Sequence, residues 1–92
     1  MSSAKTKARQ CAVQALYQWQ ITGTDLSMIE RQFAEDQRLK NAQKSYFTDL
    51  FHGVPKDLDK IDFAMKDFVD REVDDIDPVE RAILRIGVYE LM

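Results

Sequence analysis

The sequence predicts an all-α protein, and three observations favour this class. Apolar residues recur at spacings of three and four along several segments, as they do on one face of a helix. The chain contains only 3 Gly and 2 Pro, and runs of β-branched residues are few. Hydrophobic residues make up 45% of the chain and aromatic residues 10%, which favours a folded domain over a disordered tail. We therefore expect residues 1–92 to form one small bundle of about five helices.

The first predicted helix covers residues 4–21. Its inward face starts with small residues and ends with large ones: Ala8, Cys11, Ala12, Ala15, Leu16 and Trp19. Small side chains let a neighbouring helix approach closely. Gly23 follows directly and is expected to end this helix in the left-handed conformation.

Three shorter helices are expected next. One covers residues 25–36, is capped by Thr24 or Asp25, and turns Leu26, Ile29 and Phe33 inward. A polar loop over residues 37–41 leads to a helix over 42–52, which presents Tyr46, Phe47, Leu50 and Phe51 and ends at Gly53 and Pro55. The fourth covers residues 56–69, with core positions Leu58, Ile61, Met65 and Phe68. An acidic connector over 71–76 follows.

The last predicted helix begins at Asp77 and is expected to be the buried centre of the bundle. Asp77 is a strong N-cap, Pro78 suits the first helical position, and Glu80 stands where a capping-box carboxylate reaches back. Apolar residues lie on two nearly opposite sides: Val79, Ala82, Ile83 and Ile86 on one, Leu84, Val88 and Leu91 on the other. Only Arg81 and Arg85 form a polar strip. Neighbouring helices must therefore cover this helix on at least two sides.

No helix-ending signal follows Leu91, so the pattern predicts a chain that is truncated after its central helix. A truncation here would leave apolar helix faces uncovered. We accordingly expect self-association of the chain.

Charge and cysteine usage limit the cellular context. The net charge is −3, but residues 1–20 carry three bases and no acid, whereas residues 56–77 carry nine acids and four bases. This asymmetry predicts two partners of opposite charge. A single cysteine, Cys11, cannot form an internal disulfide, and no apolar run reaches the length of a signal peptide or a membrane span. We expect a soluble cytoplasmic protein that does not enter a membrane.

The sequence lacks the residue patterns of an enzyme. The single histidine, His52, is expected at a helix end, with no cysteine or acidic pair at metal-ligand spacing. No glycine-rich phosphate loop or nucleophile elbow is present. The sequence therefore predicts no catalytic residues, no metal and no cofactor.

Candidate binding residues cluster in the first helix. Three bases, Lys5, Lys7 and Arg9, lie at the helix N-terminus, where positive charge is unfavourable because of the helix dipole. An anionic partner such as RNA would offset this cost. The alternative is a basic helix end that is simply solvated. Tyr17 projects away from the core face alongside Gln14, a combination suited to stacking and hydrogen-bonding single-stranded RNA bases. The alternative for Tyr17 is packing against another part of the fold.

Two further residues each have two candidate roles. Arg9 borders the buried face and Glu90 lies on the side of its helix that carries Ile86, so a buried Arg9–Glu90 pair would make Arg9 structural rather than an RNA contact. Glu80 either closes the capping box or offers its carboxylate to a basic partner. Spacing leaves both questions open.

Two long strings, residues 8–20 (ARQCAVQALYQWQ) and residues 79–91 (VERAILRIGVYEL), resemble the opening and central helices of the bacterial transcription antitermination factor family NusB. Tyr46-Phe47 and Gly53-Val54 also stand where that family has them. The resemblance implies a non-enzymatic, NusB-like helical fold. It further implies binding of single-stranded boxA RNA in ribosomal RNA leaders, together with the ribosomal protein NusE, within an RNA polymerase antitermination complex.

The resemblance carries RNA contacts over to Lys5, Lys7, Arg9 and Tyr17, and NusE contact over to Glu80. The family's arginine-rich segment is replaced here by Thr6 and two lysines, so the expected RNA affinity depends more strongly on salt. Two rival interpretations are a NusB-like protein-interaction module of a ribosomal RNA methyltransferase and a structural helical module without RNA binding. RNA binding over a salt series distinguishes them.

Overall fold

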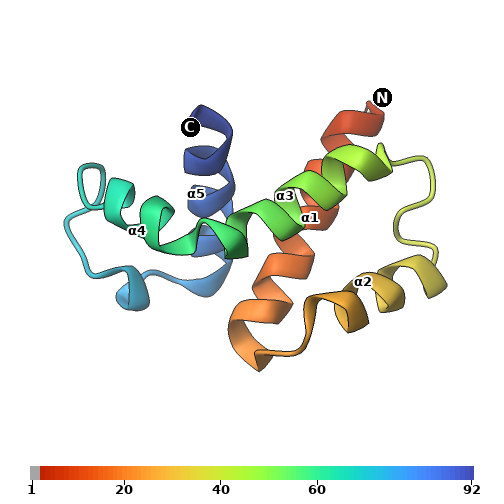
Figure 1. Cartoon of the computed structure of the whole chain (residues 1–92), viewed down its shortest axis with the longest axis horizontal. Coiled ribbons are helices and arrows are strands. Elements are labelled where there is room, and N and C mark those ends of the chain that lie inside the picture. Colours follow the sequence, from red (N-terminus) through yellow and green to blue (C-terminus); the bar gives the residue numbers. More distant parts are fainter. Residues whose placement is uncertain (1–2) are drawn as a thin grey trace.

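The computed structural model describes residues 3–92, which form a bundle of short helices (Figure 1). In chain order these are α1 (Ala4–Thr22), α2 (Leu26–Glu35), α3 (Lys44–Lys56), α4 (Leu58–Met65), the short 3₁₀ helix η1 (Val73–Asp75) and α5 (Pro78–Leu91). Residues 3–92 include no β-strand. The predicted all-α class, with five α-helices, is confirmed.

Two helices organise the packing. Helix α1 contacts α2, α3 and α5, and α5 also contacts α3 and α4. In Figure 1, α3 crosses the middle of the molecule, with α2 near one end and α4 near the other. The prediction that earlier helices cover α5 on at least two sides is confirmed, because α1, α3 and α4 all pack against it.

The start and end of α1 follow from local sequence. The Ser3 hydroxyl accepts the Thr6 N–H at 3.0 Å, and Gly23 adopts a left-handed φ of 68° while donating to the Trp19 carbonyl at 2.8 Å. Ala8, Ala12 and Ala15 are fully buried, so α3 and α5 can approach α1 closely, as predicted. The remainder of the core consists mainly of Leu16, Ile29, Phe33, Phe47, Leu50, Phe51, Val54, Ile61, Met65, Ile76 and Ile86.

The prediction that α5 is mostly buried is wrong for three of its apolar residues, although Ala82, Ile86 and Val88 are buried. Val79 and Ile83 are 45% and 53% exposed, and Leu91 is 83% exposed. Arg85, predicted to lie on an outer polar strip, is instead buried among the packed helices. Its side chain has charged and polar partners there, in Asp62 and Gln20.

Helices α3 and α4 also differ from the predicted bounds. Gly53 and Pro55 do not end α3, which continues to Lys56. Gly53 is tolerated because the Tyr89 ring packs directly on it and leaves no space for a Cβ atom. Helix α4 ends at Met65, where tighter turns begin, and Phe68 is 68% exposed rather than part of the core.

Ile21, Val79 and Ile83 are all more than two-fifths exposed, and we call them the exposed apolar strip. Ile21 at the end of α1 and Val79 at the start of α5 line one hollow, and Ile83 lies one turn further along α5. Among residues 3–92, no helix has both the length and the apolar content that crossing a bilayer requires.

Candidate nucleic-acid interface

The outward face of α1 carries a shallow, largely apolar hollow of about 380 Å³. Tyr17, 41% exposed, stands in it, and the other lining residues are Val13, Gln14, Gln18, Ile21, Thr22, Arg38 and Val79. No carboxylate is present among these described lining residues. An accessible aromatic ring beside amides, without nearby negative charge, can stack on a nucleic-acid base.

The three N-terminal bases do not form one patch. Lys5 places its Nζ 5.0 Å from the centre of the Tyr46 ring, and Arg9 turns to the same side of α1, toward α3 and α5. Lys7 lies about 200° around α1 from Lys5 and therefore on another side of the helix. Lys5 and Arg9 therefore flank one edge of the helix, and Lys7 shares the opposite side with Gln14.

Arg9 makes the predicted pair with Glu90. Its Nη2 donates to the Glu90 carboxylate at 2.7 Å and to the Tyr46 hydroxyl at 3.2 Å, and Tyr46 itself donates to Glu90. The pair is not buried as expected, because the side chains of Arg9 and Glu90 are 49% and 26% exposed. Burial raises the pKa of Glu90, but the hydrogen bonds from Tyr46 and Arg9 outweigh it and hold that pKa below its ordinary value.

A second, more polar hollow lies beside this pair, between α3 and α5. It is lined by Lys5, Tyr46, Asp49, Leu50, Asp57, Tyr89, Glu90 and Met92. Tyr89 donates to Asp49 at 2.7 Å. This hydrogen bond, burial and the charges of Asp49 and Asp57 raise the pKa of Tyr89 to about 12. Three carboxylates, those of Asp49, Asp57 and Glu90, thus line this hollow together with the ammonium group of Lys5.

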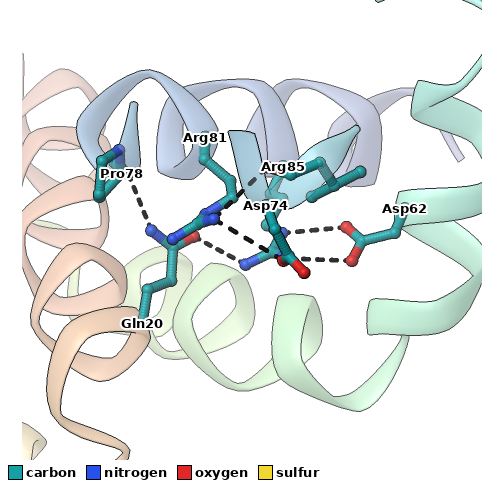
Figure 2. Close-up of polar contacts among 7 residues, drawn as sticks. Gln20, Asp62, Asp74, Pro78, Arg81 and Arg85 are labelled. Carbon is teal, nitrogen blue, oxygen red and sulfur yellow. Dashed lines mark hydrogen bonds and ion pairs between the residues drawn. The ribbon is translucent and has the colours of Figure 1, made fainter. Parts of the chain in front are cut away.

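A network that the sequence did not suggest connects the interior helices. Arg85 on α5 donates through Nε and Nη2 to both carboxylate oxygens of Asp62 on α4, at 3.0 and 2.9 Å. Its Nη1 donates to the side-chain oxygen of Gln20 on α1 at 2.9 Å, and the Gln20 amide donates to the Pro78 carbonyl at 2.8 Å. Figure 2 shows these contacts converging between α1, α4 and α5.

Arg81 lies next to this network, about one turn of α5 before Arg85. Its Nη1 donates to the Val73 carbonyl at 3.4 Å and lies 3.9 Å from the exposed Asp74 carboxylate (Figure 2). The two arginines thus attach α5 to both α4 and the segment around η1. One signal for burial of Arg85 was available in the sequence, since the core residues Ala82 and Val88 stand three positions before and after it.

Glu80 is exposed and free of the predicted capping box. Asp77 caps α5 as predicted, because its carboxylate accepts the N–H groups of Val79 and Glu80 at 3.2 and 3.3 Å. The Glu80 carboxylate lies 3.9 Å from Arg71 and makes no hydrogen bond to the backbone of Asp77 within the described region. Its side chain is 53% exposed and can reach a partner.

The prediction that His52 lies at a helix end is wrong, because α3 continues for another turn after it. Its Nε2 lies 3.1 Å from the Glu30 carboxylate on α2. Across residues 3–92, no group of three or more His, Cys, Asp and Glu side chains is arranged to hold a metal ion. His52 therefore links α2 to α3.

Comparison with known proteins assigns the chain to a family. The family model described as NusB family matches residues 6–92. The chain belongs to the NusB family. It is 42% identical over 89 residues to the transcription antitermination protein NusB of Haemophilus influenzae strain 86-028NP, a match that covers 97% of this chain and 62% of that protein.

Other family members of the same name are equally similar. The proteins of Edwardsiella ictaluri and Pasteurella multocida are 43% and 44% identical over 89 residues, with 97% of this chain covered and 64% and 62% of theirs. The chain thus spans about three fifths of the length of the curated relatives that it matches. Their names describe transcription antitermination and no catalysis, which agrees with the prediction of a non-enzymatic NusB-family protein.

Proposed function

We propose that this chain is the RNA-binding, N-terminal portion of a single NusB-like domain in a transcription antitermination factor. In this proposal it binds boxA-type single-stranded RNA of ribosomal RNA leaders together with the ribosomal protein NusE, as part of an RNA polymerase antitermination complex. Family membership supports the role in antitermination. The observation that carries RNA binding is the exposed Tyr17 in an acid-free hollow on α1.

Each proposed RNA contact has a distinct chemical role. Tyr17 stacks on a base, and Gln14 hydrogen-bonds a base edge beside it. Lys5, Lys7 and Arg9 neutralise phosphates. Arg9 serves both of the roles considered from the sequence, because its contacts to Glu90 and Tyr46 use Nη2 alone and its Nη1 and Nε remain available for a phosphate.

The proposed NusE contact lies on the acidic side of the molecule. Glu80 is exposed, and the preceding segment presents further exposed carboxylates at Asp70, Glu72, Asp74, Asp75 and Asp77. Negative charge attracts a basic ribosomal protein and repels RNA, so the two ligands use separate surfaces.

RNA binding over a salt series tests the proposal. Three phosphate contacts to a single strand predict that log K falls with log salt at a slope of about −2. Tyr17→Ala should weaken binding by about 1 to 3 kcal/mol, whereas Tyr17→Phe, which keeps the ring, should bind nearly as well as wild type. Binding without preference for boxA over a scrambled RNA, or without salt dependence, would refute the RNA-binding function.

The NusE contact has its own test. Glu80→Lys should weaken NusE binding without changing RNA affinity or the melting temperature. Glu35→Lys, at an exposed acid at the end of α2, is the matched control and should leave NusE binding unchanged. Equal weakening by both variants would assign the effect to net charge rather than to Glu80.

A second candidate function is a protein-interaction module, either attached to a ribosomal RNA methyltransferase or purely structural. The exposed apolar strip favours it, since Ile21, Val79 and Ile83 offer apolar area suited to a protein surface. In that case RNA would bind weakly and without sequence preference, so the salt series also decides between the two functions.

A further inference from the structure

A base outside α1 reaches the hollow on α1 from the turn between α2 and α3. This residue is Arg38, the one charged residue among those described as lining the hollow. The turn owes its shape to left-handed backbone at Gln37 and Asn41, with φ of 59° and 66°, and to Leu39, which is 6% exposed and belongs to the core. The turn is therefore anchored to the bundle.

Two hydrogen bonds fix the backbone of Arg38 itself. Its N–H donates to the Phe33 carbonyl at 3.0 Å, and its carbonyl accepts the Cys11 thiol of α1 at 3.3 Å. The second bond ties the turn directly to the helix that carries Tyr17. The position of Arg38 relative to α1 is thus set before any ligand binds.

The side chain of Arg38 is also held. Its guanidinium carbon lies 4.6 Å from the centre of the Phe33 ring, and Phe33 is only 1% exposed, so this ring is a fixed platform. The side chain is nevertheless 48% exposed. Stacking on one face leaves the edge of the guanidinium, with its N–H donors, directed to solvent.

The charges around Arg38 favour an anion. Burial raises the pKa of Cys11, and the nearby charges of Lys7 and Arg38 oppose that rise. The acid paired with Arg38 is Asp36, at 3.7 Å and on the surface, and such an exposed pair contributes little. Arg38 therefore brings a positive charge to the hollow that Gln14 and Tyr17 also line.

We propose that Arg38 is a further RNA-binding residue, which holds a phosphate of the single strand whose base stacks on Tyr17. This inference rests on the proposed RNA-binding function and extends it to a residue outside α1. Its guanidinium supplies the planar, bidentate phosphate contact that Lys5 and Lys7 cannot form. Arg38 thereby compensates for the lysines in the N-terminal segment.

Fluorescence anisotropy of a labelled boxA-type RNA, measured with the 92-residue chain over a salt series, tests the proposal. R38Q should weaken binding about tenfold and reduce the salt slope by about 0.7, the contribution of one phosphate on a single strand. The matched control is R31Q, which removes an exposed arginine of α2 that does not line the hollow. It should change affinity less than about twofold.

A second variant tests Arg38 without altering it. D36N removes the competing carboxylate and should strengthen RNA binding about twofold, whereas E35Q, at the neighbouring exposed acid, should not. Thermal melting of each variant confirms that folded proteins are compared.

The outcomes separate this inference from the proposed function. If R38Q and R31Q have the same affinity and slope while Tyr17→Ala weakens binding, Arg38 is not an RNA contact and the proposed function stands. If the wild-type chain shows no preference for boxA-type RNA, the proposed function and the role of Arg38 both fail.

Discussion

Replacing Asp62 by Asn tests whether the network around Arg85 holds α1, α4 and α5 together. The change keeps the size of the side chain but removes the charge of the carboxylate that accepts two of the three Arg85 hydrogen bonds, at 3.0 and 2.9 Å. The Arg85 side chain is only 8% exposed, so its positive charge would remain in a site with little access to water. An uncompensated buried charge is strongly destabilising.

The magnitude follows from the exposure of the two partners. Breaking a fully buried ion pair by removing one partner costs about 3 to 5 kcal/mol. Here the Asp62 side chain is 27% exposed and Gln20 retains its hydrogen bond to Arg85, so water and the amide offset part of that cost. We expect a loss of about 2 kcal/mol, which lowers the melting temperature of a domain of this size by roughly 8 to 16 °C.

Thermal unfolding followed by circular dichroism measures this loss. The matched control is Asp67→Asn, at an exposed acid after α4 that has no ion pair within the described region, and it should change stability by less than about 0.5 kcal/mol. The double variant Asp62→Leu with Arg85→Met leaves no unpaired charge and should be more stable than Asp62→Asn alone. An Asp62→Asn protein that melts with the control would show that the network contributes nothing to stability.

Three further predictions concern packing, pH and association. Gly53→Ala should destabilise the fold by about 1 to 3 kcal/mol because the new methyl group overlaps the Tyr89 ring. Gly87→Ala has open space around the new methyl group and should stabilise α5 by roughly 0.5 to 1 kcal/mol. Chemical denaturation checks that the two changes in unfolding free energy have opposite signs. The pKa of Glu90 is lowered, so its contribution to folding stability should be present above its ordinary pKa of 4.5 and disappear as the pH falls through the lower folded value. The unfolding midpoints of wild type and Glu90→Gln should therefore converge in acid. A difference that stays constant with pH would contradict the role of the Arg9 pair. The exposed apolar strip should drive concentration-dependent self-association, which sedimentation velocity detects, and Ile83→Ser should reduce it; a chain that stays monomeric at every concentration would refute this expectation.

Local signals in the sequence were sufficient to predict most of the helices. The start of α5 at Asp77 and the end of α1 at Gly23 depend on a cap and a left-handed glycine, which act within a few residues. The small residues of α1 also stood at helical spacing, so its buried face could be assigned. The exposed position of Tyr17 followed directly from that face.

What the sequence did not reveal depends on contacts between distant residues. The apolar residues of α5 lie on two sides, and only the positions of α1, α3 and α4 decide that Ala82 and Ile86 are buried while Val79 and Ile83 are not. The Arg85 site depends on Asp62, which is 23 positions away. No helical periodicity encodes such a pairing.

The same limit explains the misplaced end of α3 and the overlooked base at the interface. From the sequence alone, Gly53 predicts the end of a helix. The structure shows that the Tyr89 ring packs on this glycine within the helix. Arg38 belongs to a polar turn in the sequence, and contacts with distant residues, the buried Leu39 and the hydrogen bond from Cys11, bring that turn to the hollow on α1. Features of the interface that come from one helix were predictable, and those that come from a second segment were not.

The side chain of Gln20 restricts which amino acids can occupy position 20. Its amide group gives a hydrogen bond to the Pro78 carbonyl and receives one from Arg85 at the same time. Glutamate lacks the donor, lysine lacks the acceptor, methionine lacks both, and asparagine is one methylene shorter. A library randomised at this codon and selected for thermal stability should therefore return glutamine.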